Sequence, residues 1–487
     1  MSRAGRSVGT GGDPQQASRR PGAARTAALA VYLPALVFEI GIGAVLPVVA
    51  LSATALGASL ATAGLMIALL AVGQIVGDMP AGALAARIGD RRAMLVAAAL
   101  SVLALAGAAL AQDVVALGVC MLALGATNAV FTLARHSYLT EVTPVLRRAR
   151  ALSTLAGVQR IGTFIGPFAG AGLIHLTDLR APYWLAVGTS VAAAVVVAVV
   201  PDVAGGRAPV TRVSTWRVLQ DHRHVFATLG IAVVLVGAAR GSRQTVLPLW
   251  SEHLGLAPAT TSIVFGLSGA VDMLLFYPAG KVMDRFGRLW IGIPSMLVVA
   301  VAFVLLPLTD GFGSLTLVAM LLGLGNGMGS GILMTLGSDV APPATRSRFL
   351  GIWRLLQDGG SAGGPLIVAG GAALGSLAAG IAAMGGVSLA AAAALGRWTP
   401  RFSVHANRTS RRRALASGVS EQLVRPRLVP SLPDQGEEAE DQAGGADRHG
   451  PPADDRRDGQ GRRHDERDGP QGDPEPEDPT QVELERS

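Results

Sequence analysis

Residues 278–288, PAGKVMDRFGR, repeat the pattern of residues 80–90, PAGALAARIGD, at an offset of 198 positions. The same offset aligns the chain with itself without a gap from Pro80 to Pro167. Matches of Ala and Gly are common by chance in this composition, whereas matches of Pro, Asn, Gln and Arg are not. The matches of the second kind include Arg87 with Arg285, Asn128 with Asn326, Pro144 with Pro342, Arg148 with Arg346, Arg150 with Arg348, Gln159 with Gln357 and Pro167 with Pro365. The sequence therefore predicts two similar halves.

The composition excludes a single soluble globular protein. Of 487 residues, 50% are hydrophobic and 15% are charged, with a mean hydropathy of +0.44, whereas a soluble domain has about 25% charged residues. Residues 434–487 hold 18 of the 34 acidic residues and 7 of the 41 basic ones, so residues 1–433 keep 16 acidic and 34 basic residues. This distribution indicates a long membrane-embedded body followed by a polar tail.

The apolar part divides into twelve stretches, each close to the 20 or so residues that cross a membrane as a helix. They lack the strict alternation of a β-barrel, and within lipid a helix satisfies its own backbone groups. The stretches lie near residues 27–51, 60–85, 93–111, 114–140, 151–175, 182–200, 225–250, 258–282, 289–308, 314–338, 349–374 and 376–396.

The offset of 198 carries spans 2–5 onto spans 8–11, so both halves cross the membrane in the same direction. We therefore predict an all-α membrane protein with twelve transmembrane helices in two pseudo-symmetric six-helix bundles. The expected parts are a cytoplasmic N-terminal tail (1–25), an N-terminal bundle (26–200), a cytoplasmic linker (201–224), a C-terminal bundle (225–396) and a disordered cytoplasmic tail (397–487).

Basic residues concentrate in alternate connections between the spans. These basic stretches fall at residues 87–92, 147–150, 207–223, 281–288 and 346–348. Because Arg and Lys in short loops stay in the cytoplasm, both termini are expected there. The sequence thus predicts a multi-pass protein of the plasma membrane.

The remaining chemistry-bearing residues indicate neither an enzyme nor a metal protein. Cys120 is the only cysteine, which excludes a disulfide framework and a thiolate metal cluster. The eight histidines are scattered without the spacing of metal ligands, and no motif suggests catalysis. We expect no cofactor, no nucleic-acid partner and a monomer in the lipid bilayer.

The repeated loop resembles the signature of the major facilitator superfamily, and the resemblance covers residues 25–396. The second copy matches the family pattern well, whereas the first has Ala86 in place of the family's aspartate and an acid, Asp90, after its second glycine. The resemblance implies a cytoplasmic gate that latches the halves. The alternative is that these charges only set the topology. The implied gate residues are Gly82, Arg87, Gly89, Asp90, Arg91, Glu141, Gly280, Asp284, Arg285, Gly287, Arg288 and Asp339.

Span 5 resembles the glycine-proline motif of twelve-span drug:proton antiporters of this superfamily. The matching residues are Gly162, Gly166, Pro167 and Gly170, and Ala171 replaces the final glycine of the motif. The resemblance implies export in exchange for protons. The alternative is tight helix packing, since Gly360–Pro365 has a similar pattern.

Nine charged residues fall inside predicted spans, where each costs at least about 2.5–3.5 kcal/mol without a partner. Arg160 and Asp272 lie at similar depth, on spans 5 and 8, which adjoin in the family fold, so the resemblance implies that they pair. Spans 2 and 11 also adjoin in that fold, which implies a cluster of Asp78, Arg354 and Asp358. Glu39 and Arg240 are expected in the family's central cavity. The acids, which are candidates for proton coupling, are Glu39, Asp78, Asp272 and Asp358. The bases, which are candidate partners or substrate contacts, are Arg135, Arg160, Arg240, Arg243 and Arg354.

A carboxylate that gains and loses an arginine partner during a cycle can load and release a proton, with Glu39 and Asp78 as leading candidates. A permanent structural ion pair is the alternative for each acid. The predicted function is a secondary transporter that exports a small amphipathic compound in exchange for protons by alternating access. A metabolite or sugar-type proton symporter and a non-transporting membrane receptor are the alternatives.

Overall fold

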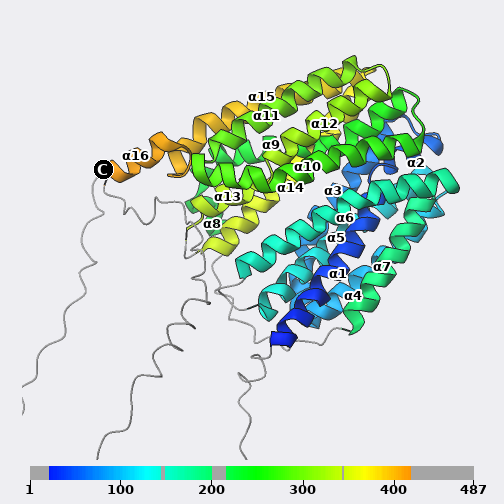
Figure 1. Ribbon diagram of the computed structural model, residues 1–487, viewed down its shortest axis with the longest axis horizontal. Coiled ribbons are helices and arrows are strands. Elements are labelled where there is room, and N and C mark those ends of the chain that lie inside the picture. Colours follow the sequence, from blue (N-terminus) through cyan, green and yellow to red (C-terminus); the bar gives the residue numbers. More distant parts are fainter. Residues whose placement is uncertain (1–20, 144–147, 200–214, 343–344, 418–487) are drawn as a thin grey trace, which may run out of the picture. The chain divides into compact units, whose positions relative to one another are not determined.

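The computed structural model of the chain describes residues 21–143, 148–199, 215–342 and 345–417, which are helical and contain no strand (Figure 1). The first half comprises α1 (Pro21–Val45), α2 (Val49–Ala55), α3 (Leu60–Ile88), α4 (Asp90–Ala109), α5 (Val114–Val142), α6 (Arg148–Leu176) and α7 (Ala181–Val199). The second half comprises α8 (Thr215–Asp221), α9 (Arg223–His253), α10 (Pro258–Phe286), α11 (Leu289–Leu305) with the short 3₁₀ turn Leu306–Leu308, α12 (Phe312–Met328), α13 (Ile332–Val340), α14 (Arg346–Ala373), α15 (Leu377–Phe402) and α16 (Arg408–Ala416).

These helices are consistent with the twelve predicted spans when α1–α2 and α12–α13 are each counted as one interrupted span. Pro47 separates α1 from α2, and Gly331, with φ of +83°, separates α12 from α13. In the described part of the chain, 10 spans are long and apolar enough to cross a membrane by composition alone. The other two, α6 and α14, carry charges such as Arg160 and Arg354 within their length.

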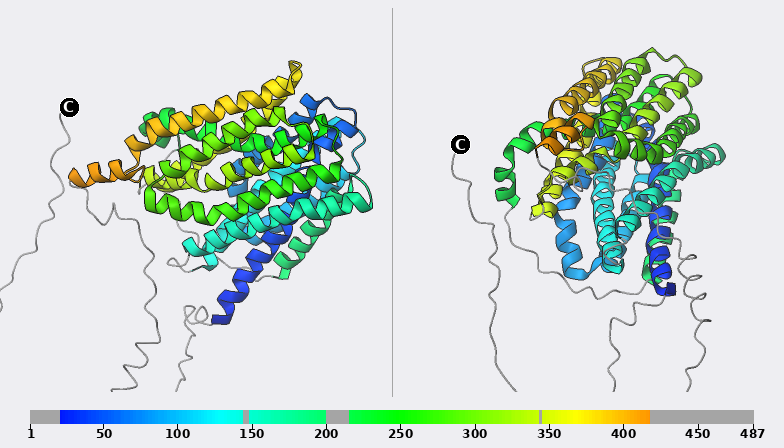
Figure 2. Two further views of the ribbon diagram at one scale, coloured as in Figure 1. Left: turned by 45° about the horizontal axis from the view of Figure 1, so that its top comes forward. Right: turned by 60° about the vertical axis from the view of Figure 1, so that its left-hand side comes forward.

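The two halves pack their helices in the same order. In the first half α1 lies against α6 and α7, α3 against α5, and α4 against α5 and α7. In the second half α9 lies against α14 and α15, α10 against α12, and α11 against α12 and α15. Between the halves, α3 packs on α14 and α6 packs on α10 (Figures 1 and 2).

Close backbone contacts extend the 198-residue register beyond the range that the sequence alignment covered. A Cβ on Gly43 would lie 2.8 Å from the Thr163 carbonyl oxygen, and one on Gly241 would lie 2.2 Å from that of Ser361. Each member of the second contact lies 198 positions after its counterpart. The repeat therefore includes the packing of span 1 on span 5 and of span 7 on span 11.

The turns after α3 and α10 require glycine in both halves. Gly89 has φ of +87° and Gly287 has φ of +112°, a left-handed conformation that is unfavourable for other residues. These are the two equivalent glycines of the repeated loop, so their conservation within the chain has a backbone cause.

The predicted boundaries of the tail and linker need correction. Residues 397–402 complete α15, and Ser403 and Ala406 are buried beside the α10–α11 turn. The backbone N–H of Arg288 donates to the His405 carbonyl at 3.1 Å, and that of Leu289 donates to the Ala406 carbonyl at 3.0 Å. These contacts order a segment that the sequence predicted as tail, because its small residues fit a crowded turn.

At the linker, α8 and the start of α9 already occupy positions 215–224, and α1 already begins at Pro21 within the predicted first tail. The rest of the predicted first tail (1–20), of the linker (201–214) and of the last tail (418–487) lies outside the described residues.

Candidate functional site

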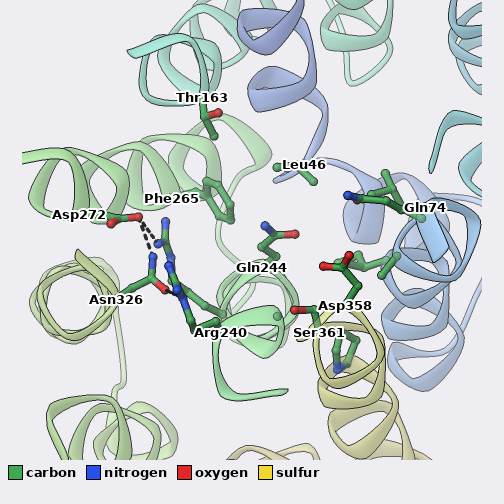
Figure 3. Close-up of a pocket in the computed structure, with 16 residues that line it drawn as sticks. Leu46, Gln74, Thr163, Arg240, Gln244, Phe265, Asp272, Asn326, Asp358 and Ser361 are labelled. Carbon is green, nitrogen blue, oxygen red and sulfur yellow. Dashed lines mark hydrogen bonds and ion pairs between the residues drawn. The ribbon is translucent and has the colours of Figure 1, made fainter. Parts of the chain in front are cut away.

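A cavity of about 290 Å³ lies between the two halves (Figure 3). Its walls come from α3 and α6 of the first half and from α9, α10, α12 and α14 of the second. Charged and amide side chains make up much of the lining. The polar residues among them are Gln74, Thr163, Arg240, Arg243, Gln244, Asp272, Asn326, Asp358 and Ser361.

Asp272 on α10 is the centre of the polar network in this cavity. Its Oδ1 is 3.2 Å from Nη1 of Arg160, and its Oδ2 is 3.0 Å from Nη1 of Arg243. Asn326 Nδ2 donates to the same Oδ2 at 2.7 Å. The predicted pairing of Arg160 with Asp272 is therefore present, and it joins α6 of one half to α10 of the other.

Arg240 joins this network through an amide. Its Nε donates to Asn326 Oδ1 at 2.9 Å, so Asn326 bridges Arg240 and Asp272. Arg160 also donates to Ser330 Oγ and stacks over Phe276, with 4.4 Å from its Cζ to the ring centroid. We call Arg160, Arg240 and Arg243 the arginine cluster.

A second cavity of about 200 Å³ adjoins the first. The two share Thr163, Arg243, Phe265 and Asp272 as walls, and Arg160 and Phe164 line only the second. The Asp272 carboxylate and the Arg243 guanidinium therefore face both spaces.

Glu39 lies in a separate network inside the first half, and it is absent from the lining of the main cavity. The expected place of Glu39 in that cavity is thus not observed, whereas Arg240 occupies its expected place. Glu39 Oε1 is 3.3 Å from Nη2 of Arg135 and accepts a hydrogen bond from Gln159 Nε2 at 3.1 Å. Arg135 is 1% exposed, and its Nε and Nη1 have no hydrogen-bond partner within the described part of the chain.

The predicted cluster of Asp78, Arg354 and Asp358 forms in part. Arg354 Nε is 3.4 Å from Asp358 Oδ2, one turn further along α14. Asp78 on α3 lies near enough for its charge to interact with those of Arg354 and Asp358, although none of the described residues makes an ion pair with it. Asp358 lines the main cavity, across from Asp272 and Asn326 (Figure 3).

Two of the implied gate residues of the second half, Asp284 and Asp339, contact a third, Arg288. Its Nη1 is 3.0 Å from Asp284 Oδ1, and its Nε is 3.1 Å from Asp339 Oδ2. Asp339 also accepts a hydrogen bond from Ser403 Oγ at 3.0 Å. In the first half, Arg91 donates to the backbone carbonyls of Val197 at 3.2 Å and of Ala198. These contacts join helices within each half.

The remaining implied gate residues lie in or near the turns at the same end of the bundle. Gly89 and Gly287 form the two turns described above, and the Arg285 guanidinium lies 5.4 Å from the Phe286 ring centroid. The other positions border the same ends of α3, α5 and α10, namely Gly82, Arg87, Asp90, Glu141 and Gly280.

The glycines of the antiporter-like motif pack α6 on α1. A Cβ on Gly162 would be 2.8 Å from the Leu36 carbonyl oxygen, and one on Gly166 would be 2.4 Å from that of Ile40. For Gly170 the nearest atom is the Ala44 carbonyl oxygen at 3.3 Å. Pro167 lies inside the same helix. This geometry matches the packing alternative for the glycine stripe.

Sequence reasoning did not identify Asn326, Gln244 or Gln74 as site residues. Asn326 had a signal, because its match with Asn128 at the fixed offset is improbable by chance in this composition. Gln74 also had one, because the offset pairs it with Asp272, and both line the cavity.

Two six-helix halves around a polar cavity define a membrane transporter built from parallel repeats. The family model described as Major Facilitator Superfamily matches residues 31–365 and, in a second alignment, residues 229–430. The chain therefore belongs to the major facilitator superfamily and is a multi-pass membrane transporter.

Known relatives support the same family without defining a substrate. An uncharacterized MFS-type transporter of Yersinia enterocolitica is 26% identical over 223 residues, which are 45% of this chain and 56% of that relative. The match thus spans little more than half of the relative's length.

Solved structures of similar fold include the nucleoside transporter NupG, with 13% identity, a TM-score of 0.63 and coverage of 76% of this chain and 98% of NupG. A D-xylose-proton symporter has 16% identity and a TM-score of 0.60, with coverage of 78% of this chain and 98% of the symporter. The human organic anion transporter MFSD10 has 17% identity and a TM-score of 0.56, with coverage of 77% and 100%. At these identities the likeness shows the fold alone.

Proposed function

We propose that this chain is a secondary transporter that moves a small polar solute by alternating access, in exchange for protons. The observation that carries the proposal is the polar cavity between the halves, beside the ion pair of Arg160 with Asp272 that joins them. Alternating access requires a site between the halves that opens to each side of the membrane in turn, and contacts between the halves that break and re-form. A fixed hydrophobic seam between the halves would serve a receptor better.

The lining of the cavity changes the expected solute from amphipathic to polar. Arginine, aspartate, glutamine and asparagine side chains lose their hydrogen bonds to water when a solute enters the cavity. A solute binds well there only if its own polar groups take the place of that water. An apolar drug would leave these groups unpaired. The same polarity supports the second candidate, a metabolite-type proton symporter.

Export remains the proposed direction because span 5 resembles the antiporter motif. Its glycine stripe also has a packing role, and the matching stripe of Gly360 and Gly364 packs on α9 in the same way. Antiport and symport move the solute in opposite directions along a proton gradient, so a transport measurement separates them.

Among the four candidate acids, Asp78 and Asp358 are best placed to carry the proton. They share one nearby arginine, Arg354, so two carboxylates face a single positive charge. One proton held by this pair would make the cluster neutral, and its release would create a negative charge inside the membrane. Glu39, by contrast, pairs with an arginine that no second acid shares, and Asp272 pairs with two arginines.

The proposed orientation places the basic connections in the cytoplasm, with both termini on that side of a plasma membrane. The charges of Arg91, Arg285 and Arg288 lie at one end of the bundle, at the turns after α3 and α10. The positive-inside rule assigns that end to the cytoplasm, and the gate would then close the cytoplasmic side. A monomer carries the whole cavity, since both halves belong to one chain.

Transport into sealed liposomes tests this function. Liposomes that contain the full chain and an acidic interior are incubated with a mixture of polar metabolites, and the contents are measured by mass spectrometry. Antiport accumulates a solute inside, whereas symport depletes a preloaded one, whatever the orientation of the protein. Movement of no solute, with or without the pH gradient, would favour the receptor alternative.

A matched pair of variants then tests the proton site. Asp78→Asn combined with Asp358→Asn should abolish the effect of the pH gradient while exchange of solute for solute continues. Glu39→Gln should leave the gradient effect in place. If Glu39→Gln abolishes the effect of the pH gradient and the double variant keeps it, Glu39 is the proton site.

A further inference from the structure

The arginine cluster carries more positive charge than its resident carboxylate balances. Arg160, Arg240 and Arg243 surround one acid, Asp272, directly or through Asn326. An unbalanced charge inside a membrane needs a partner, water or a functional role. The space around the cluster therefore keeps excess positive charge with Asp272 ionised, because the other carboxylate of the main cavity, Asp358, is paired with Arg354.

The donors of the cluster are incompletely used. Arg243 is 11% exposed, and its Nε is buried without a hydrogen-bond partner within the described residues. Arg240 commits its Nε to Asn326, and its side chain lines the cavity. Gln244 reaches into the same space, between Asp272 and Asp358 (Figure 3). A planar guanidinium with open donors matches the oxygens of a carboxylate or phosphate.

The repeat shows that the cluster is not a consequence of the fold. The equivalents of Arg240, Arg243 and Asp272 in the first half are Ile42, Val45 and Gln74. The halves share the bridging asparagine, as Asn128 and Asn326, and the close glycine contacts beside it, but only the second half has these charges. The same backbone packing is thus achieved without arginine, and the cluster serves something other than packing.

We propose that the arginine cluster binds an anionic group of the transported solute, a carboxylate or a phosphate, and that Asp272 is the resident counterion which this group displaces. The proposal rests on the proposed transport function and names the chemistry of its solute. Displacement would release Asp272 from Arg160, which is the ion pair between α6 and α10. Solute binding would thereby loosen one contact between the halves.

Binding of simple anions tests the proposal independently of transport. The melting temperature of the full chain in detergent is measured at constant ionic strength with succinate, with inorganic phosphate, and with two isosteres of succinate, butane-1,4-diol and butane-1,4-diamine. Succinate or phosphate should raise the melting temperature, whereas the neutral and cationic isosteres should not. The stronger of the two anions distinguishes a carboxylate solute from a phosphate solute.

Three variants separate a binding role from a structural one. Arg240→Gln should abolish the anion effect, whereas Arg180→Gln, in the exposed α6–α7 connection, should keep it. Asp272→Asn should lower the melting temperature without anion and tighten anion binding roughly tenfold, because the competing carboxylate is gone. If the role of Asp272 is purely structural, Asp272→Asn should lower the melting temperature without any gain in anion affinity.

The outcomes distinguish this proposal from the transport proposal. No effect of either anion on the native chain and on Asp272→Asn would overturn the anion site, even if liposomes transport a neutral or cationic solute. If anions bind in detergent with the predicted pattern among the variants, but the same protein moves no solute in liposomes, the anion site is supported and the transport function is overturned.

Discussion

At the scale of single residues, the pair of Glu39 with Arg135 has the strongest consequence for stability. Arg135 is almost fully buried and has one acidic partner, Glu39, at 3.3 Å. Removing one member of a buried pair costs about 3–5 kcal/mol because it leaves the other charge uncompensated, whereas replacing both with neutral groups is often nearly neutral.

We therefore expect Glu39→Gln to lower the melting temperature of the purified chain by roughly 5 °C or more. Adding Arg135→Met to Glu39→Gln should restore most of the loss. The same two proteins, assayed in liposomes, decide between the roles of Glu39. If the double variant keeps full proton-coupled transport, the role of Glu39 is structural. If the double variant moves solute without coupling to protons, Glu39 is a proton carrier.

A second residue-scale prediction concerns the ion pair of Arg160 with Asp272. A simple pair would recover transport when both charges are exchanged. Asp272 also binds Arg243 and Asn326, so an arginine at position 272 would face the remaining arginines of the cluster. We expect Arg160→Asp combined with Asp272→Arg to recover less than about a tenth of transport. Recovery to near the native rate would show that the contact with Arg243 is dispensable.

At the scale of helices, the glycine stripe of α6 predicts where substitution is tolerated. A Cβ at Gly166 would lie 2.4 Å from a backbone oxygen of α1, whereas one at Gly157 on the same helix would meet no atom within 4 Å. Backbone atoms cannot move aside as a side chain can, so α1 and α6 would have to separate.

Gly166→Ala should accordingly lower the yield of folded protein and its melting temperature, because overpacking costs about 1–3 kcal/mol of the free energy of unfolding. Gly157→Ala should keep the yield and raise the melting temperature slightly, since alanine has the better helix propensity and its Cβ meets no atom within 4 Å. Size-exclusion profiles and melting curves of the two variants provide the comparison. Equal tolerance at both positions would mean that α1 and α6 are not packed as described.

The end of α15 gives a second prediction at this scale. Residues 403–406 bond to the α10–α11 turn and to Asp339, beyond the point where the sequence predicted a tail. A chain ending at residue 417 should keep its melting temperature, whereas one ending at residue 402 should lose several degrees, since the Arg288 and Leu289 backbone donors lose their acceptors. An equal effect of the two truncations would contradict this docking.

At the scale of the whole molecule, the sequence predicts the architecture better than the site. Twelve apolar stretches and one fixed offset are enough for two six-helix halves, because the lipid allows few alternatives to helices. Depth along a helix, together with the adjacency of spans 5 and 8 that the family resemblance implies, also predicts the contact of Arg160 with Asp272. Depth does not give the direction in which a side chain points, so the separate network of Glu39, Arg135 and Gln159 is visible only in the structure.

The tail boundary was mispredicted for a related reason. Ser403 and Ala406 are small and unremarkable in sequence, and their burial depends on the shape of the turn between α10 and α11. Local composition predicts a polar segment correctly but does not show whether a neighbouring loop has a place for it.

The last prediction concerns the movement of the halves. At the end of the bundle opposite the basic turns, Gly64 on α3 faces Ala369 on α14, and a Cβ on Gly64 would lie 3.2 Å from that of Ala369. That separation is slightly shorter than the usual 3.5–4.5 Å between the Cβ atoms of a disulfide. In a background with Cys120→Ala, which removes the only cysteine, Gly64→Cys with Ala369→Cys should form a disulfide on oxidation.

If transport requires the halves to separate at this end, oxidation should stop it and a reductant should restore it. Each single cysteine variant, treated with the same oxidant, controls for other effects of oxidation. Because the bond would hold one end closed without touching the cavity, the oxidised protein should still bind anions at the arginine cluster. Undiminished transport by the fully cross-linked protein would mean that the solute moves without separation of α3 and α14, which alternating access between two rigid halves does not allow.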